Sequence, residues 1–328
     1  MSIGDRRALL EAALAGEPLE RLPVALWRHF PVDDQRAESL AAATLHFQRT
    51  WDFDVVKISP SSNYCVADWG VVTRWEGNQE GTRTYISRRV RTPEEYEHIE
   101  RLDVRRGMLG EMVRAAELIV KALPEETPCV MTVFSPLTVV RYLRGDEFVV
   151  DLRRFPDAVL HALEVITRVY EDFVASVLDV GCAGIFLAVQ PATHRLLSED
   201  EYRRFGEPFD RRLLAVAERG WLNVLHAHGH DIMWELLAAY PVQAINWHDR
   251  HTFPSLAEAR SRFGGALIGG LRQWETLLRG TPEAVRAEVA DAREQVEGRS
   301  LIVGAGCVIP VTTPWGNLRA AVEAARGT

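Results

Sequence analysis

Eight short apolar segments, nearly all separated by helical stretches, are the feature that most constrains the fold of this 328-residue chain. Strands that alternate with helices indicate a parallel α/β sheet, and eight is the number that closes into a (β/α)8 TIM barrel. We therefore expect one barrel domain over residues 1–328. An open doubly wound sheet is the alternative, although no Gly-x-Gly-x-x-Gly pattern follows the first strand. The apolar segments lie at residues 23–30, 53–58, 128–134, 184–189, 222–228, 244–249, 266–270 and 301–306.

Local signals place the connecting elements. Asp33 or Asp34 is expected to cap a helix that runs to about residue 50. Ser198 begins a capping box, and Thr281 followed by proline begins a helix to about residue 295. Residues 71–92 resemble an exposed hairpin. Further helices are expected at about residues 5–16, 93–102, 108–123, 155–179, 231–239 and 314–326.

The composition excludes several classes of protein. The chain has 38 Lys and Arg against 46 Asp and Glu, with no basic run of the kind that binds phosphate backbones, so we expect no nucleic-acid partner. No apolar run approaches the roughly 18 residues of a membrane span, and the first residues lack the apolar core of a secretory signal. Four cysteines in a chain of this length do not form a disulfide framework. We expect a reduced, cytoplasmic protein.

A candidate metal site lies at the ends of two predicted strands. His226 and His228 are two residues apart on the fifth strand, so their side chains project together. Cys307 follows the eighth strand. Two imidazoles and a thiolate are ligands that zinc prefers, and three protein ligands leave one position for catalysis. Zinc in such a site can bind and deprotonate a thiol or polarise an oxygen. The alternative is two hydrogen-bonded interior histidines and an inert cysteine.

Other polar residues gather at the same ends, where the active sites of barrels of this kind are found. Gln190 ends the fourth strand, and Asp249 ends the sixth. Asp249 is a candidate partner for the second ring nitrogen of His226 or His228, because zinc-bound imidazoles commonly donate to a carboxylate. Each residue also has a purely structural interpretation as a satisfied polar group or a charge pair. The remaining strand-end residues are Arg28, His29, Lys57, Ser135, His248, Gly269 and Gly270.

The chain resembles the uroporphyrinogen decarboxylase superfamily over nearly its whole length. The resemblance implies a (β/α)8 barrel, in agreement with the count of strands. The segments that carry it, in chain order, are residues 23–28, 134–142, 197–208, 246–249, 268–271 and 306–318.

True decarboxylases of this superfamily need no metal, and the sequence departs from them. Arg28 matches the first arginine of their pocket, but the second is absent. No acid follows the second strand in Lys57-Ile-Ser-Pro60, and Ala305-Gly-Cys307 replaces their Gly-His-Gly turn. Tyr142 does match their tyrosine after the third strand. Arg28 and Tyr142 therefore join Gln190 and Asp249 as catalytic candidates.

The zinc methyltransferases of the superfamily are similar at the ligand positions. They carry His-x-Cys at the end of the fifth strand and a cysteine in a Gly-Cys-x-Ile-Pro turn after the eighth. This chain has His226-Ala-His228 and Gly306-Cys-Val-Ile-Pro310. Histidine at 228 keeps a ligand but removes one negative charge from the metal, which makes zinc a stronger Lewis acid and a bound thiolate less nucleophilic. The resemblance thus implies zinc on His226, His228 and Cys307.

The leading hypothesis is a zinc-dependent methyltransferase that moves a methyl group between a small substrate and a corrinoid. We expect the corrinoid on a partner protein, because the chain lacks a corrinoid-binding Asp-x-His-x-x-Gly segment. A metal-free decarboxylase of a porphyrinogen or smaller acid stays open as an alternative, as does a non-catalytic barrel that binds a small ligand. Members of the superfamily are often dimers, so a homodimer is compatible with the resemblance.

Overall fold

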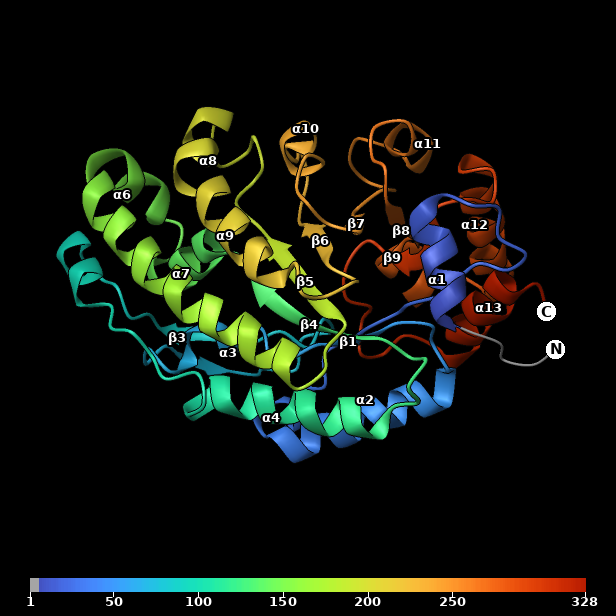
Figure 1. The fold of residues 1–328 in the computed structure, drawn as a ribbon, viewed down its shortest axis with the longest axis horizontal. Helices are drawn as coiled ribbons and strands as arrows, with labels where there is room; N and C mark the ends of the chain where they lie inside the picture. The colour runs from blue at the N-terminus through green and yellow to red at the C-terminus, as the bar shows by residue number, and fades with distance from the viewer. Residues whose placement is uncertain (1–5) are drawn as a thin grey trace.

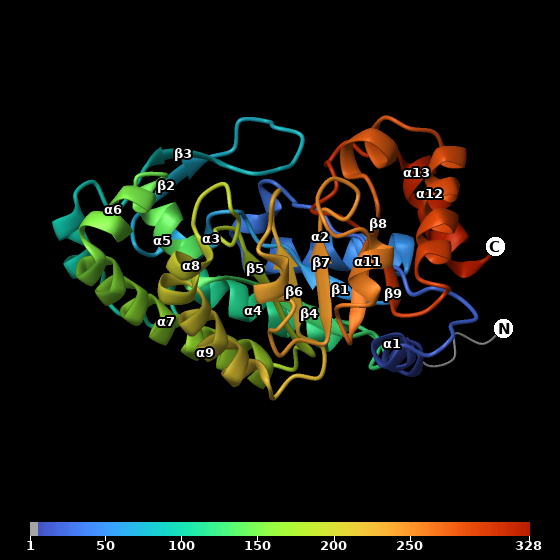
Figure 2. The ribbon, with the colours of Figure 1, turned by 90° about the horizontal axis from the view of Figure 1, so that it is seen from above.

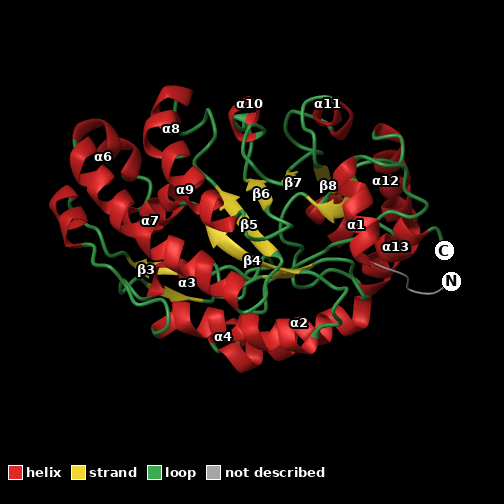
Figure 3. Cartoon of the chain, in the orientation of Figure 1, coloured by secondary structure: helices red, strands yellow, loops and turns green. Residues whose placement is uncertain are grey.

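The computed structural model describes residues 6–328, and a curled parallel sheet of seven strands lies at its centre (Figure 3). Each of these strands pairs with the next one along the chain, and all their residues are buried. Nearly continuous apolar strands of this kind are typical of parallel sheets with both faces covered. The strands are β1 (Val56–Ile58), β4 (Cys129–Phe134), β5 (Gly184–Val189), β6 (Val224–Ala227), β7 (Ala244–Trp247), β8 (Ala266–Leu271) and β9 (Leu301–Ala305).

The first of the eight expected strands is not a regular strand. Residues 23–25 lie between β9 and β1, and the Ala25 N–H donates to the Val303 carbonyl at 2.9 Å. On the other side, the Asp54 N–H donates to the Val24 carbonyl at 2.9 Å, and the Val24 N–H donates to the Asp54 carboxylate at 2.9 Å. The segment thus forms a single bridge with Val303 of β9, and on the side of β1 a side chain takes the place of one backbone acceptor.

Helices surround the sheet (Figure 1). No helix within residues 6–328 is both long and apolar enough to cross a bilayer. The longer elements are α1 (Arg6–Ala15), α2 (Ala37–Trp51), α4 (Gly107–Ala122), α5 (Pro136–Arg144), α6 (Phe148–Arg154), α7 (Pro156–Asp179), α8 (Glu199–Phe205), α9 (Glu207–Ala217), α12 (Pro282–Gln295) and α13 (Trp315–Arg326). The shorter ones are η1 (Asp33–Gln35), α3 (Tyr64–Ala67), η2 (Pro93–His98), α10 (Trp234–Leu237), α11 (Leu256–Arg260) and the π-helical η3 (Gln273–Leu278).

The predicted hairpin is confirmed as β2 (Val72–Arg74) and β3 (Thr84–Ser87), which pair antiparallel. Figure 2 shows the hairpin and its loop on one side of the sheet and α1 on the opposite side. The helix expected at residues 5–16 is α1, with residue 5 outside the described residues. The capping box at Ser198 is also confirmed, since its hydroxyl accepts from the Glu201 N–H at 3.2 Å.

The predicted cap at Asp33 or Asp34 is wrong. Both residues belong to the short η1 turn, and α2 begins only at Ala37. The Ala37 N–H donates to the Glu111 carboxylate of α4 at 2.7 Å. A side chain distant in sequence therefore satisfies the helix end, and no local signal could reveal it.

Candidate metal centre

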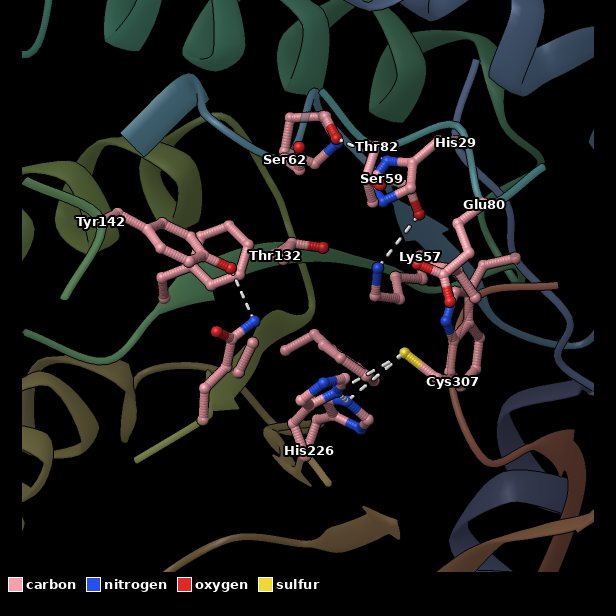
Figure 4. A pocket seen from close by; sticks show the side chains of 18 residues that line it. His29, Lys57, Ser59, Ser62, Glu80, Thr82, Thr132, Tyr142, His226 and Cys307 are labelled. Atoms are coloured by element: carbon pink, nitrogen blue, oxygen red, sulfur yellow. Dashed lines mark hydrogen bonds between the residues drawn. The ribbon is translucent and has the colours of Figure 1, made fainter. Parts of the chain in front are cut away.

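A cavity of about 170 Å³ lies at the carboxyl ends of the strands (Figure 4). The strand residues that line it are spaced by two, as in Phe186, Ala188 and Gln190, because alternate side chains of a strand share one face. The full lining is Trp27, His29, Lys57, Ser59, Pro60, Ser62, Glu80, Thr82, Thr132, Phe134, Tyr142, Phe186, Ala188, Gln190, His226, His228, Cys307 and Val308.

The three residues predicted as metal ligands converge in this cavity. The Cys307 Sγ atom lies 3.7 Å from His226 Nε2 and 3.8 Å from His228 Nδ1, and the two nitrogens are 3.4 Å apart. Tetrahedral zinc with ordinary bond lengths would hold two nitrogens about 3.3 Å apart, and a sulfur and a nitrogen about 3.6 Å apart. The donor types and their spacing therefore fit zinc and leave a fourth position for a substrate atom.

An asparagine fixes the tautomer of His226. The Asn246 amide donates both its hydrogens to backbone carbonyls, those of Ile268 at 2.8 Å and Ala305 at 3.0 Å. Its oxygen must therefore face His226 Nδ1, 2.6 Å away, and Nδ1 must carry the proton. The Nε2 lone pair of His226 is consequently directed to Cys307 and is ready to bind a metal.

Backbone contacts position the turn that carries Cys307. Gly306 allows this turn to pass close to β7, because a Cβ atom there would lie 2.9 Å from the Cα atom of His248. The Ile309 N–H then donates to the Trp27 carbonyl at 2.9 Å. The sulfur is therefore placed by backbone geometry, and a flexible loop is not required to close around a metal.

Burial sets the protonation of the three donors. It lowers the pKa of His226 well below its usual value, with a further contribution from His228, and it lowers the pKa of His228 to about 4. Burial raises the pKa of Cys307 to about 11. At pH 7 both imidazoles are therefore neutral, which is the form that binds metals. The thiol keeps its proton until a cation replaces it.

Two of the catalytic candidates, Tyr142 and Gln190, lie together in the cavity. The Gln190 amide donates to the Tyr142 oxygen at 2.6 Å. Burial raises the pKa of Tyr142, so its hydroxyl stays protonated and can donate to a bound molecule.

Arg28 is not among the residues that line this cavity. Its guanidinium donates to the Val311 carbonyl at 2.9 Å and lies 5.3 Å from the Phe30 ring, beside a separate surface groove. Trp27 and His29, on either side of it, do line the cavity, so alternation along the extended segment directs Arg28 away. The structure therefore does not bring Arg28 together with Tyr142 and Gln190.

The predicted contact between Asp249 and a histidine is wrong. The Asp249 carboxylate accepts from the Gly270 N–H at 3.1 Å and lies 3.7 Å from Arg250 Nε, so it links the end of β7 to β8. Burial raises the pKa of Asp249 to about 7. Asn246 takes the position beside His226 instead, because the sheet register pairs these two residues.

His248 stands next to the three converging donors. Its ring lies 5.3 Å from that of His228, and its Nδ1 is 3.4 Å from the Gln273 amide nitrogen. Burial lowers the pKa of His248 to about 3. The histidine is therefore neutral, packed against the site, and outside the ligand group formed by the described residues.

Sequence reasoning missed Asn246 and Glu80. A buried amide within an apolar strand is a signal that Asn246 needs a partner, although not which one. Glu80 reaches the cavity from the loop of the β2–β3 hairpin, and nothing in its local sequence indicates this. The sequence predicts Lys57 only as a strand-end residue, yet it is 9% exposed, and burial lowers its pKa to about 7.

The chain is similar to several known proteins. A methylated-thiol–coenzyme M methyltransferase of Methanosarcina mazei is 26% identical over 239 residues, which cover 72% of this chain and 61% of that relative. A solved methyltransferase from Methanosarcina mazei superposes with a TM-score of 0.85 at 20% identity, over 98% of both chains. A B12-independent methionine synthase from Shewanella sp. W3-18-1, solved with selenomethionine, superposes with a TM-score of 0.58 at 13% identity, over 97% of this chain and 96% of that one.

The sequence model of one family, uroporphyrinogen decarboxylase (URO-D), matches residues 5–328. Because this match covers nearly every residue of the chain, the protein belongs to the uroporphyrinogen decarboxylase family.

Proposed function

We propose that this protein is a zinc-dependent methyltransferase that moves a methyl group between a small substrate and a corrinoid carried by a partner protein. The observation that carries the proposal is the convergence of His226, His228 and Cys307 at spacings that suit tetrahedral zinc. The methyltransferase among its relatives supports the reaction class.

The residues around the site have distinct tasks under this proposal. Zinc, when bound, would supply the Lewis acidity that deprotonates a substrate thiol near neutral pH. Phe134, Phe186 and Trp27 line the cavity and keep water away from the reacting sulfur. Gln190 donates to the Tyr142 oxygen, so the Tyr142 hydroxyl hydrogen is free to orient a polar group of the substrate.

The proposal includes the architecture that holds the site. We propose a closed (β/α)8 barrel formed as one domain by residues 1–328. Its support is that residues 23–25 hydrogen-bond to β9 on one side and to Asp54, just before β1, on the other. A closed ring would present the cavity at one end only, where a corrinoid protein would have to dock.

Methyl transfer from free methylcobalamin tests the activity. Zinc-loaded protein is mixed with methylcobalamin and 2-mercaptoethanol, and loss of the cobalt–carbon absorption is followed. We expect turnover that requires zinc and that falls by about 100-fold or more in Cys307→Ala, since the metal is then lost. Equal rates with and without zinc would refute the proposal.

A metal-free decarboxylase has one observation in its favour, because Tyr142 lines the cavity. The position of Arg28 outside the cavity speaks against it, as does a volume of about 170 Å³ for a substrate with eight carboxylates. Release of carbon dioxide from uroporphyrinogen by protein treated with a chelator would replace our proposal with this one.

A further inference from the structure

Two side chains of opposite charge, Lys57 and Glu80, line the cavity and form no ion pair with any residue that the structure describes. Lys57 Nζ donates to the Ser59 hydroxyl at 3.0 Å, and no carboxylate of residues 6–328 forms an ion pair with it. Glu80 is partly buried, and within the same described residues it has neither an ion pair nor a side-chain hydrogen bond. Figure 4 shows both side chains reaching toward the cavity.

Burying a cation without a counter-charge costs free energy, so the position of Lys57 indicates that it has a partner outside the chain. The rings of Phe186 and Trp27 lie 4.6 and 5.5 Å from Nζ and offset part of this cost. Two of the three ammonium hydrogens still lack an acceptor among residues 6–328. A thiolate at Cys307 would be a partial counter-charge, but the proposed zinc takes up that charge. Lys57 is therefore equipped to receive an anionic group from a ligand.

The loop that carries Glu80 is held in place over the cavity. The Val311 N–H donates to the carbonyl of Gln79 at 2.7 Å. On the other side, Gly81 has φ +78°, and a Cβ atom there would lie 2.8 Å from the Cβ atom of His29. Contacts on both sides of Glu80 thus fix its backbone beside the cavity, which its side chain lines.

We propose that the cavity binds a small zwitterion, an α-amino acid with a sulfur-containing side chain. Its carboxylate binds Lys57 and Ser59, its ammonium group binds Glu80, and its sulfur faces His226, His228 and Cys307. This assignment rests on the proposed function for the role of the sulfur. A cavity of about 170 Å³ suits so small a molecule, because pockets for drug-sized ligands occupy roughly 300–1,000 Å³.

Four thiols that share a 2-mercaptoethyl group and carry different charged groups test this assignment by calorimetry on the zinc-loaded protein: L-homocysteine, 3-mercaptopropionate, cysteamine and 2-mercaptoethanol. We expect L-homocysteine to bind tightest, by about tenfold or more over each singly charged thiol, since each charged contact contributes about that factor. Lys57→Met should weaken the binding of L-homocysteine and of 3-mercaptopropionate by about tenfold or more. It should leave the affinity for cysteamine unchanged. Glu80→Gln should weaken the binding of L-homocysteine and of cysteamine. It should leave the affinity for 3-mercaptopropionate unchanged.

Glu76→Gln is the matched control, because Glu76 is an exposed carboxylate of the same hairpin that pairs with Arg74 outside the cavity. It should change none of the four affinities. Zinc content must stay at the wild-type value in all three variants. Loss of zinc in Glu80→Gln would overturn the assignment, because the carboxylate would then serve the metal. Equal binding of all four thiols would overturn it too, while leaving the proposed zinc chemistry intact.

L-Methionine on zinc-free protein separates the two proposals, because its thioether does not need the metal. We expect measurable binding that Lys57→Met and Glu80→Gln each weaken by about tenfold or more. This result would support the zwitterion site even if methyl transfer were absent. No binding of L-methionine to correctly folded zinc-free protein, with no preference for L-homocysteine in the zinc-loaded form, would overturn it.

Discussion

At the residue scale, His226 is oriented by an amide and not by a carboxylate. Asn246 fixes the same tautomer that an aspartate would fix, but it brings no negative charge to the imidazole. Histidine at position 228 likewise contributes no charge, where a cysteine would contribute one. Both differences act in the same direction, so we expect zinc in this site to be a strong Lewis acid that holds a substrate thiolate firmly.

Substitutions of Asn246 and of Asp249 should affect zinc affinity differently. Asn246→Ala removes the acceptor of His226 Nδ1–H and should raise the zinc dissociation constant by about 10- to 100-fold. Asp249→Asn should leave it within about twofold, because Asp249 bonds to Gly270 and not to a ligand. Competition with a chromophoric chelator measures both constants. A larger loss in Asp249→Asn than in Asn246→Ala would contradict the contacts described above.

Zinc affinity should increase with pH with a slope set by one proton. Cys307 has a pKa of about 11 without metal, so binding displaces its proton throughout pH 6–9. The pKa of His228 is about 4, so the histidines are already neutral in this range. The dissociation constant should therefore fall about tenfold for each unit of increase in pH. A dissociation constant that does not change between pH 6 and 9 would show that zinc binding displaces no proton from Cys307.

At the element scale, residues 23–25 join the two edges of the sheet through Asp54. This carboxylate is fully buried, accepts from the Val24 N–H and pairs with Arg21 at 2.8 Å. It thus replaces the ladder that a regular first strand would have formed with β1. The stability of this junction should depend on this single side chain more than on any exposed ion pair.

Asp54→Ala should lower the free energy of unfolding by about 3–5 kcal/mol, because it leaves the Val24 N–H and a partly buried arginine without their acceptor. Asp172→Ala is the control. Asp172 pairs with Arg101 at the surface, so its loss should cost about 1 kcal/mol or less. Urea titration of both variants provides the comparison. Equal losses would mean that Asp54 does not hold the two edges together.

The sequence could predict the contacts that follow from local pattern, and not those that depend on how distant segments meet. The alternation of side chains and the common position of strand ends were enough to bring His226, His228 and Cys307 together. Asp249 was assigned wrongly because the neighbour of His226 depends on the register of β6 and β7, which local sequence does not set. Glu80 was missed because its contact depends on how a hairpin loop folds over the strand ends. The prediction of a regular first strand was wrong because the Asp54 carboxylate, and not a backbone carbonyl of a neighbouring strand, accepts the hydrogen bond of the Val24 N–H.

At the scale of the whole molecule, the candidate metal ligands and the charged residues of the cavity lie at one end of the sheet. The strands supply the candidate ligands, the turn after β9 supplies the sulfur, and the hairpin supplies a carboxylate opposite a buried lysine. The remainder of residues 6–328 is a scaffold of buried apolar strands and the helices that cover them. This separation makes the candidate centre testable without disturbing the fold, because its three donors lie in a cavity and not in the packed core.

The central claim is that His226, His228 and Cys307 hold zinc, and metal analysis of protein purified without a histidine tag tests it most directly. We predict about one zinc per chain in the wild type. We predict the same content in Cys65→Ser, whose buried sulfur lies outside the cavity lining, and loss of zinc in both His226→Ala and Cys307→Ala. A wild-type protein without metal after incubation with zinc would contradict the account, as would full zinc content in both of these alanine variants.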